Sequence, residues 1–217
     1  MSICLELRLS EQRQRGEVQL NVIFEGLPGA GKSTVIAAIQ RTTENGQLLV
    51  LDEFLNHIPG DPRDIAYFLN NEAEKNERMK GRASGMVLCD RLWQSTLVYN
   101  AVACNVQSPD ELLSLQKIIY KNKTFEDYIY VYLSLPSSMS LSRHSNTGMD
   151  DCIWFNPTFN SRAQYIYEML YDNLERFSPN VISKIRIQTD QKTEKQVLAE
   201  IIGFLESICP DCRGKKL

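Results

Sequence analysis

The chain has 217 residues, of which 43% are hydrophobic and 24% are charged, so its composition is that of a globular protein with one substantial core. A net charge of −3 offers no basic surface to a nucleic-acid polymer, and no apolar run reaches the roughly 18 residues of a membrane span. We therefore expect the protein to bind no nucleic-acid polymer and to have no membrane span. Residues 1–19 carry three glutamates and no apolar core, so they are not a signal peptide and predict a cytoplasmic protein.

The chain begins with a polar lead-in, residues 1–17, followed by a strand, a loop and a helix. The apolar run at residues 20–25 predicts the strand, and a helical pattern extends from the loop to about residue 43. Between them lies Gly26-Leu27-Pro28-Gly29-Ala30-Gly31-Lys32-Ser33-Thr34. This is the phosphate-binding motif G-x-x-x-x-G-K-[ST], in the strand–loop–helix context that its mechanism requires. We infer that the protein binds a nucleoside triphosphate.

Each part of this P-loop has an expected role with ATP and Mg²⁺. Glycines allow backbone N–H groups to curl around an anion, and the helix N-terminus adds its dipole. Lys32 is expected to reach the β- and γ-phosphates, and the hydroxyl of Ser33 is expected to hold Mg²⁺. The residues expected to bind the nucleotide here are Gly26, Gly29, Ala30, Gly31, Lys32, Ser33 and Thr34.

Strands and helices alternate along the rest of the chain. Further strands are predicted at residues 48–51, 85–89, 129–133 and 181–187. Helices are predicted at residues 65–79, 93–105, 109–121, 136–144, 162–177 and 192–208. This alternation predicts an α/β fold of the P-loop type, with three α/β/α layers around a five-stranded parallel sheet. Residues 1–217 are predicted to form one domain with a lid at about residues 145–160 and a tail at residues 209–217.

Two details within these elements carry their own expectations. In the helix at residues 65–79, the apolar residues fall on one side, which we expect to be the buried side. They are Ile65, Phe68, Leu69, Ala73 and Met79. In the tail, Cys209 and Cys212 form a close pair, which suits a metal site, a redox pair or simply a loose end.

Ligands of parallel sheets bind at the carboxyl ends of the strands, and two charged residues stand there after the third strand. Asp90 is in the position of the second acid of P-loop enzymes, so we expect it to hold Mg²⁺ together with Ser33. The alternative role for Asp90 is to cap the following helix. Arg91 is always charged and suits phosphate oxygens.

Two stretches resemble a known family. They are the P-loop with the preceding Phe24-Glu25, and Asp90-Arg91-Leu92-Trp93-Gln94-Ser95 with Tyr99 beyond it. Both are similar to the thymidylate kinase and deoxynucleoside kinase group, and the similarity extends over about residues 20–208. The resemblance implies an ATP-dependent kinase, and because that group is usually dimeric it also implies a homodimer.

The resemblance also implies roles for individual residues. The adenine of ATP would lie between Arg143 and the segment around Asp190, and Arg91 would contact the transferred or the acceptor phosphate. Ser95 and Tyr99 would line the acceptor pocket. The alternative for Ser95 and Tyr99 is an ordinary surface and core position on a helix, and for Arg143 an ordinary surface position.

Departures from the family pattern bear on the acceptor. Pro28 stands where thymidylate kinases usually carry an acid for the sugar of the acceptor. No arginine in a suitable register precedes the third strand to grip an acceptor monophosphate, since Arg78 has no convincing register there. No arginine or lysine lies between Arg143 and Arg162, where a lid normally supplies cations.

Asp52 and Glu53 follow the second strand, where deoxynucleoside kinases place a glutamate that acts as a base. A hydroxyl acceptor benefits from such a carboxylate, whereas a phosphate acceptor needs none. Either residue is a candidate catalytic base, and the alternative is a cap for the following loop. The function expected is transfer of the γ-phosphate of ATP to a nucleoside, a nucleoside monophosphate or another small-molecule hydroxyl. The alternative is a P-loop NTPase that acts as a hydrolytic switch and has no small-molecule acceptor.

Overall fold

The computed structural model describes residues 19–43, 48–61, 64–80, 85–121, 123–144 and 153–208. The predicted lead-in, the tail with Cys209 and Cys212, and residues 145–152 of the predicted lid lie outside the described residues. Along the described parts of the chain, no helix combines the length and the apolarity that crossing a membrane demands.

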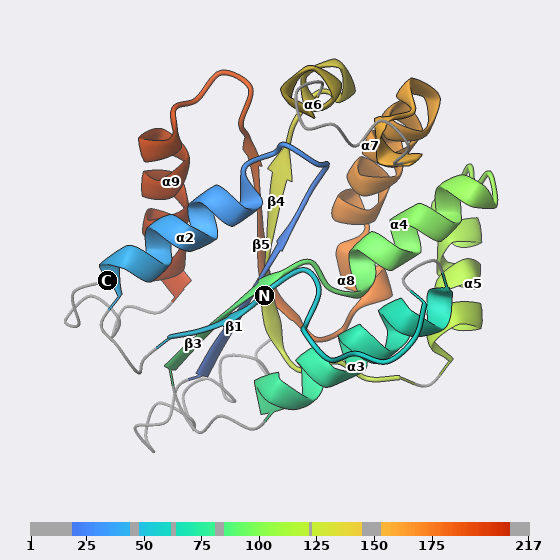
Figure 1. Ribbon diagram of the computed structural model, residues 1–217, viewed down its shortest axis with the longest axis horizontal. Helices are drawn as coiled ribbons and strands as arrows, with labels where there is room; N and C mark the ends of the chain where they lie inside the picture. Colours follow the sequence, from blue (N-terminus) through green and yellow to red (C-terminus); the bar gives the residue numbers. More distant parts are fainter. Residues whose placement is uncertain are drawn as a thin grey trace.

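A parallel sheet forms the centre of the molecule (Figure 1). Its strands are β1 (Gln19–Glu25), β2 (Leu48–Leu51), β3 (Gly85–Asp90), β4 (Tyr128–Ser134) and β5 (Val181–Gln188). They lie in the order β2-β3-β1-β4-β5, and each neighbouring pair is parallel. Strands covered on both faces are nearly continuously apolar, which is why runs such as those of β3 and β4 were visible in the sequence. The five-stranded α/β fold is confirmed.

Helices cover both faces of the sheet (Figure 1). They are α2 (Lys32–Thr42), α3 (Ile65–Lys80), α4 (Trp93–Ala103), α5 (Pro109–Tyr120), α6 (Ser137–His144), the 3₁₀ turn η1 (Ile153–Phe155), α7 (Pro157–Asp172), α8 (Leu174–Phe177) and α9 (Glu194–Ile208). Helices α2 and α9 pack on one face against Val22 and Phe24 of β1. Residues of α3, α4, α5, α7 and α8 form a second core on the other face with Ile23. Because side chains alternate along a strand, β1 contributes to both cores.

The buried side of helix α3 is not the apolar side that we expected. Ile65 and Ala73 are exposed, and Phe68 and Leu69 are only half-buried. The side chains buried in this helix are Asn71, Glu72, Lys75, Asn76 and Met79. The physical reason is that α3 packs over loop backbone, where carbonyl groups need hydrogen-bond donors.

Helix α7 begins earlier than the sequence pattern suggested. Its N-cap is Asn156, whose side chain accepts a hydrogen bond of 3.0 Å from the backbone N–H of Phe159, and Pro157 occupies the first turn. Residues 157–160, which we placed in the lid, therefore form the first turn of α7. The predicted helix at residues 162–177 is divided into α7 and α8.

Candidate active site

The P-loop joins β1 to α2 through three glycines in the left-handed region of φ. Gly26, Gly29 and Gly31 have φ values of 143°, 75° and 95°. A Cβ atom on Gly26 would lie 2.3 Å from the carbonyl oxygen of Leu133, so the end of β4 leaves room only for glycine. Gly31 is the N-cap of α2 and provides no side-chain cap, and the first turn of α2 has no acid. The N–H groups of this turn are therefore suited to an anion.

Lys32 is folded back onto the loop that precedes it. Its side chain is 6% exposed, and Nζ donates hydrogen bonds of 3.1 Å to the carbonyl of Gly26 and 3.3 Å to that of Leu27. Burial, together with the nearby charge of Arg91, lowers the pKa of Lys32 to about 8. The two carbonyls hold the ammonium at the P-loop.

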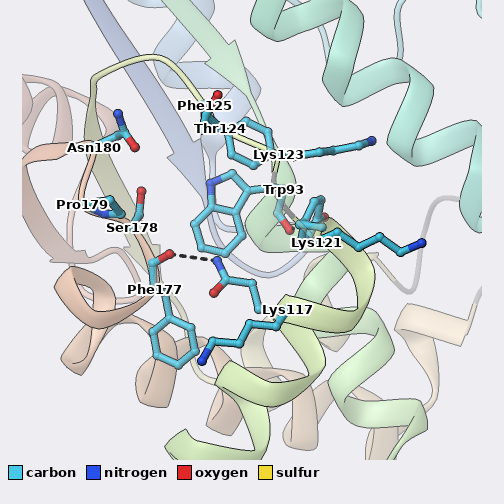
Figure 2. A pocket seen from close by; sticks show the side chains of 12 residues that line it. Trp93, Lys117, Lys121, Lys123, Thr124, Phe125, Phe177, Ser178, Pro179 and Asn180 are labelled. Atoms are coloured by element: carbon cyan, nitrogen blue, oxygen red, sulfur yellow. Dashed lines mark hydrogen bonds between the residues drawn. The ribbon is translucent and has the colours of Figure 1, made fainter.

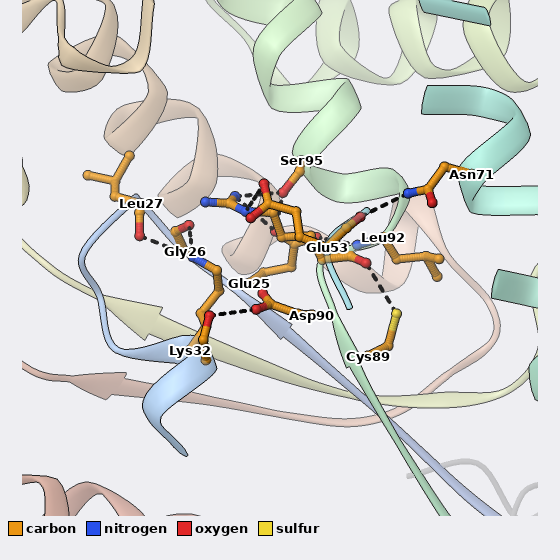
Figure 3. Close-up of polar contacts among 12 residues, drawn as sticks. Glu25, Gly26, Leu27, Lys32, Glu53, Asn71, Cys89, Asp90, Leu92 and Ser95 are labelled. Atoms are coloured by element: carbon orange, nitrogen blue, oxygen red, sulfur yellow. Dashed lines mark hydrogen bonds and ion pairs between the residues drawn. The ribbon is translucent and has the colours of Figure 1, made fainter. Parts of the chain in front are cut away.

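Ser33 and Asp90, the two expected metal ligands, lie together. Figure 3 shows Asp90 beside Lys32 of the P-loop. The hydroxyl of Ser33 donates a hydrogen bond of 2.8 Å to Oδ2 of Asp90. β1 and β3 are neighbours, with Phe24 paired to Asp90, so the P-loop and the end of β3 emerge side by side. Oδ1 of Asp90 is buried and has no hydrogen-bond partner among the described residues. A hydroxyl and one carboxylate fit Mg²⁺, which takes few protein ligands and completes its shell with phosphates and water.

Arg91 is the centre of a polar group that we call the Arg91 cluster: Glu25, Glu53, Arg91, Ser95 and Tyr167. Glu53 and Ser95 are half-buried, and the other three are buried. Nη1 of Arg91 donates to the hydroxyl oxygens of Ser95 (2.8 Å) and Tyr167 (3.0 Å) and lies 3.8 Å from Oε2 of Glu25. Nε of Arg91 lies 3.0 Å from Oε1 of Glu53. Although burial opposes the charge, the carboxylates of Glu53 and Glu25 raise the pKa of Arg91. The cluster brings together the predicted Arg91, Ser95 and Glu53.

Glu25, the last residue of β1, is fully buried in this cluster. Oε1 accepts a hydrogen bond of 2.9 Å from the backbone N–H of Leu92, and Oε2 accepts hydrogen bonds from Ser95 (2.5 Å) and Tyr167 (3.1 Å). Burial raises the pKa of Glu25, while the positive charge of Arg91 and these hydrogen bonds oppose the rise. Glu25 directly precedes the P-loop, so its hydrogen bond with Leu92 anchors the turn that follows β3 to the start of the P-loop.

Asp52 and Glu53, the two candidate bases, differ in position. Asp52 is exposed, whereas the carboxylate of Glu53 contacts Arg91 (Figure 3). Burial alone would raise the pKa of Glu53, but Arg91 and Lys32 outweigh it and hold the pKa below its usual value. Glu53 is thus ionised at neutral pH and lies in the Arg91 cluster. Of the two acids, Glu53 has the geometry of a site residue.

Tyr99 lies beyond Ser95 on helix α4 and belongs to an aromatic group. Its ring centroid is 6.4 Å from that of Trp154 and 5.5 Å from that of Phe159. The guanidinium carbon of Arg91 lies 5.6 Å from the centroid of Trp154. Aromatic side chains from α4, η1 and α7 therefore border the Arg91 cluster. This places Tyr99 against the described half of the predicted lid.

Arg143, the last arginine of α6, contacts the P-loop. Its Nη1 donates a hydrogen bond of 2.8 Å to the carbonyl of Gly29, and Ser140 of the same helix donates one of 2.7 Å to the carbonyl of Pro28. Asp190 follows β5, and its Oδ1 is buried without a partner among the described residues. The preceding Thr189 donates from its backbone N–H to the carbonyl of Ser134 over 2.9 Å. The loop after β5 is thereby tied to the end of β4.

Arg162 does not supply a cation to the P-loop in this structure. Its Nη2 donates to the carbonyl of Val106, and its guanidinium lies 5.0 Å from the ring centroid of Tyr165. The contact with Val106 holds Arg162 against the connection between α4 and α5, and Tyr165 belongs to the same helix as Arg162. The cations that the structure brings to the P-loop region are Lys32, Arg91 and Arg143.

Three residues of this region were not among the predicted site residues: Glu25, Tyr167 and Lys75. An acid at the end of an apolar strand, directly before the P-loop, was a visible signal for Glu25. Tyr167 lies within α7, far from the motifs, and no local pattern marks it. Lys75 lies on α3, and its Nζ donates to the carbonyls of Glu53, Asp90 and Arg91.

Two cavities lie away from this site, beside the segment that leads into β4. One, of about 300 Å³, lies between α3 and residues 123–125, and the other, of about 170 Å³, is bordered by Trp93, Phe125 and Phe177. Figure 2 shows the second one, in which the side chains of Lys121 and Lys123 extend away from the Trp93 ring. Neither is lined by the P-loop or the Arg91 cluster, so we assign the candidate site from its polar geometry.

No protein-family model matches the sequence, and no curated protein matches it either. Solved structures do match. The structure of deoxyadenosine kinase from M. mycoides with bound dATP aligns with a TM-score of 0.62 and 15% identity, over 86% of this chain and 100% of that chain. The structure of thymidylate kinase from Candida albicans aligns with a TM-score of 0.66 and 14% identity, over 87% of this chain and 92% of that chain. At these identities the likeness concerns the fold, and the chain has the P-loop fold seen in nucleoside and nucleotide kinases.

Proposed function

We propose that this protein is a Mg·ATP-dependent kinase that transfers the γ-phosphate to a hydroxyl group of a small molecule, namely a nucleoside. The observation that carries the proposal is the Arg91–Glu53 pair, with 3.0 Å between Nε and Oε1, at the strand ends next to Ser33 and Asp90. A cation and an ionised carboxylate at this place suit a phosphate and a hydroxyl that react with each other. A nucleoside acceptor is suggested by the likeness to deoxyadenosine kinase, whereas the likeness to thymidylate kinase suggests a nucleoside monophosphate.

Helix α3 provides the argument for a hydroxyl rather than a phosphate acceptor. An acceptor phosphate needs a cation from the surrounding helices, and all three cations of α3 already have partners. Lys75 is occupied by backbone carbonyls, Arg78 pairs with Glu74 at 2.8 Å, and Lys80 pairs with Glu77 at 2.9 Å. The carboxylate of Glu53 is better matched to a hydroxyl donor than to a second anion.

In this mechanism Ser33 and Asp90 would hold Mg²⁺, which would neutralise part of the phosphate charge. Lys32 exchanges its carbonyl partners for the β- and γ-phosphates, and Arg91 stabilises the charge on the transferred group. Glu53 orients the acceptor hydroxyl and takes its proton as the new O–P bond forms and the bond between the γ-phosphorus and the ADP oxygen breaks. Tyr99, Trp154 and Phe159 exclude water and offer ring faces to an aromatic base.

The proposal is tested by measuring ADP release with Mg·ATP and a panel of nucleosides, nucleoside monophosphates, sugars and amino alcohols. A many-fold rise in ADP release with a nucleoside, together with a phosphorylated product identified by mass spectrometry, supports the proposal. A rise in ADP release with nucleoside monophosphates alone would show that the acceptor group is a phosphate and not a hydroxyl. ADP release that does not change with any acceptor would favour a hydrolytic P-loop NTPase instead.

A further inference from the structure

Helix α3 carries a buried ammonium group that the proposed reaction does not use. Lys75 is 1% exposed. Its Nζ donates hydrogen bonds to the backbone carbonyls of Glu53 (3.0 Å), Asp90 (2.8 Å) and Arg91 (2.9 Å). An ammonium has three N–H donors, so these bonds occupy all of them. Lys75 is therefore a connection between backbone segments and is not free to bind a ligand.

The carbonyls that Lys75 binds belong to the residues whose side chains form the candidate site. Glu53 lies just beyond β2, Asp90 ends β3, and Arg91 follows it. Lys75 thus joins the ends of two neighbouring strands from one side. The distance between the carboxylate of Glu53 and the guanidinium of Arg91 depends on the relative position of these two strand ends.

The conformation of Arg91 gives this connection further importance. Its φ is 61°, in the left-handed region that residues with a side chain rarely adopt. The carbonyl of Arg91 accepts from Lys75 and, over 3.1 Å, from the thiol of Cys89, while its N–H donates to the carbonyl of Phe24 over 3.0 Å. A strained backbone position persists only when its surroundings hold it, and Lys75 provides the charged one of these three contacts.

The two strand ends are not equally dependent on Lys75. The carbonyl of Glu53 also accepts a hydrogen bond of 2.9 Å from Asn71, whose Oδ1 accepts one of 3.0 Å from the N–H of Leu55. The loop after β2 therefore keeps a second anchor when Lys75 is removed. Lys75 ties the backbone of that loop to the backbone of the turn at Arg91 through a single group, in addition to the ion pair between the side chains of Glu53 and Arg91.

We propose that Lys75 is a positioning residue, whose ammonium fixes the turn at Arg91 and its distance from Glu53. Its role in the reaction rests on the proposed kinase function, whereas its hold on the two strand ends does not. Removal of the ammonium releases the turn, so the guanidinium and the carboxylate lose their alignment with the reacting groups. The P-loop is not bound by Lys75, so ATP binding is largely retained.

The experiment compares Lys75→Met with Asn76→Ala in the full chain. Asn76 is the next residue of α3 and is also buried, but it binds the carbonyl of Thr124 and the N–H of Glu126, away from the site. Amide hydrogen exchange is measured for Arg91 and Leu92. We expect exchange about tenfold faster in Lys75→Met than in the wild type, and no such change at these amides in Asn76→Ala.

Kinetics provide the second measurement. We expect Lys75→Met to lower kcat by about 10²-fold with little change in the KM for ATP, because a small misplacement of reacting groups has an effect of this size. Equal exchange at Arg91 and Leu92 in the two variants would overturn the proposal. If Lys75→Met does not fold, Lys75→Gln, which keeps two N–H donors, is measured in its place. If the wild-type protein transfers no phosphate to any acceptor, the kinase function is wrong, and the exchange measurement alone decides whether Lys75 holds the turn.

Discussion

Arg91 and Glu53 form an ion pair in which Nε lies 3.0 Å from Oε1, although they come from different strand ends. The same guanidinium also faces the carboxylate of Glu25, at 3.8 Å. Two acids therefore face one cation. Under the proposed function, a phosphate that binds Arg91 would compete with Glu53 and release its carboxylate for a hydroxyl group. The following predictions start from this pair.

Replacement of Glu53 by glutamine is expected to lower kcat by about 10²–10⁴-fold with a smaller effect on the KM of the acceptor, because the amide cannot take a proton. The matched variant is Asp52→Asn, at an exposed position one residue away, which is expected to keep nearly all activity. The measurement is steady-state ADP release with the accepted substrate. An unchanged kcat in both variants would point to a phosphate acceptor.

Replacement of Lys32 by methionine is expected to abolish turnover, since methionine brings no charge to the β- and γ-phosphates. The fold is expected to remain, because the ammonium contacts only the carbonyls of Gly26 and Leu27 in the described structure. Circular dichroism checks the fold and ADP release checks the activity. The control is Lys192→Met. Lys192 lies in the turn before α9, and its ammonium pairs with Glu200 of that helix. Near-normal rates in Lys32→Met would remove Lys32 from the mechanism.

The lowered pKa of Lys32, about 8, predicts how ATP binding depends on pH. A bound phosphate stabilises the ammonium form and raises this pKa, so the complex holds more protons than the free protein above about pH 8. Affinity for ATP is then expected to fall as the pH rises above 8, by up to about tenfold per pH unit.

Titration calorimetry at about pH 8.5, in two buffers with different ionisation enthalpies, measures the proton uptake directly. The wild-type protein is expected to take up a fraction of a proton on binding ATP. Lys32→Met is expected to show much less uptake. Equal uptake by both proteins would assign the proton to another group.

Glu72, on the buried side of α3, predicts a dependence of stability on pH. Burial raises its pKa from 4.5 to about 7, although Tyr120 donates a hydrogen bond of 3.2 Å to its Oε1. Between pH 4.5 and 7 the unfolded chain loses this proton before the folded protein does, so Glu72 progressively lowers the free energy of unfolding as the pH rises. The full effect, above pH 7, is about 3 kcal/mol.

The Glu72→Gln variant does not titrate at this position. Its free energy of unfolding, relative to the wild type, is therefore expected to be higher at pH 8 than at pH 5. Urea unfolding at the two pH values measures this difference, and Glu77→Gln, at an exposed position of the same helix, provides the comparison. A difference that is equal at both pH values would contradict a neutral Glu72 in the folded protein.

Trp154 is expected to report substrate binding by its fluorescence. It contacts Tyr99 and lies 5.6 Å from the guanidinium of Arg91, which a phosphate would displace. The other tryptophan, Trp93, is fully buried, so Trp154→Phe isolates the background signal. The measurement is emission with ATP, with the acceptor, and with both. If the fluorescence of Trp154 responds to none of them, the prediction that residues 145–160 form a lid that closes over the substrates is wrong.

The sequence predicted the centre of the sheet well because strands such as β3 and β4 are covered on both faces and are therefore apolar runs, whereas the edge strand β5 is only half-buried. The proximity of Ser33 and Asp90 was also predictable, since the P-loop and the end of β3 belong to the same edge of one parallel sheet. The buried side of α3 was not predictable by hydrophobicity, because loop carbonyls select Asn71 and Lys75 as donors. Tyr167 was not predictable either, since its contact with Glu25 depends on how α7 packs against the sheet.

Helix α6 is fastened to the phosphate-binding loop at two successive carbonyls, by Ser140 at Pro28 and by Arg143 at Gly29. A shift of these two loop residues when nucleotide enters therefore pulls on α6. A change in the position of these loop residues is thus passed on to α6 through both hydrogen bonds, as a displacement of the helix along its length.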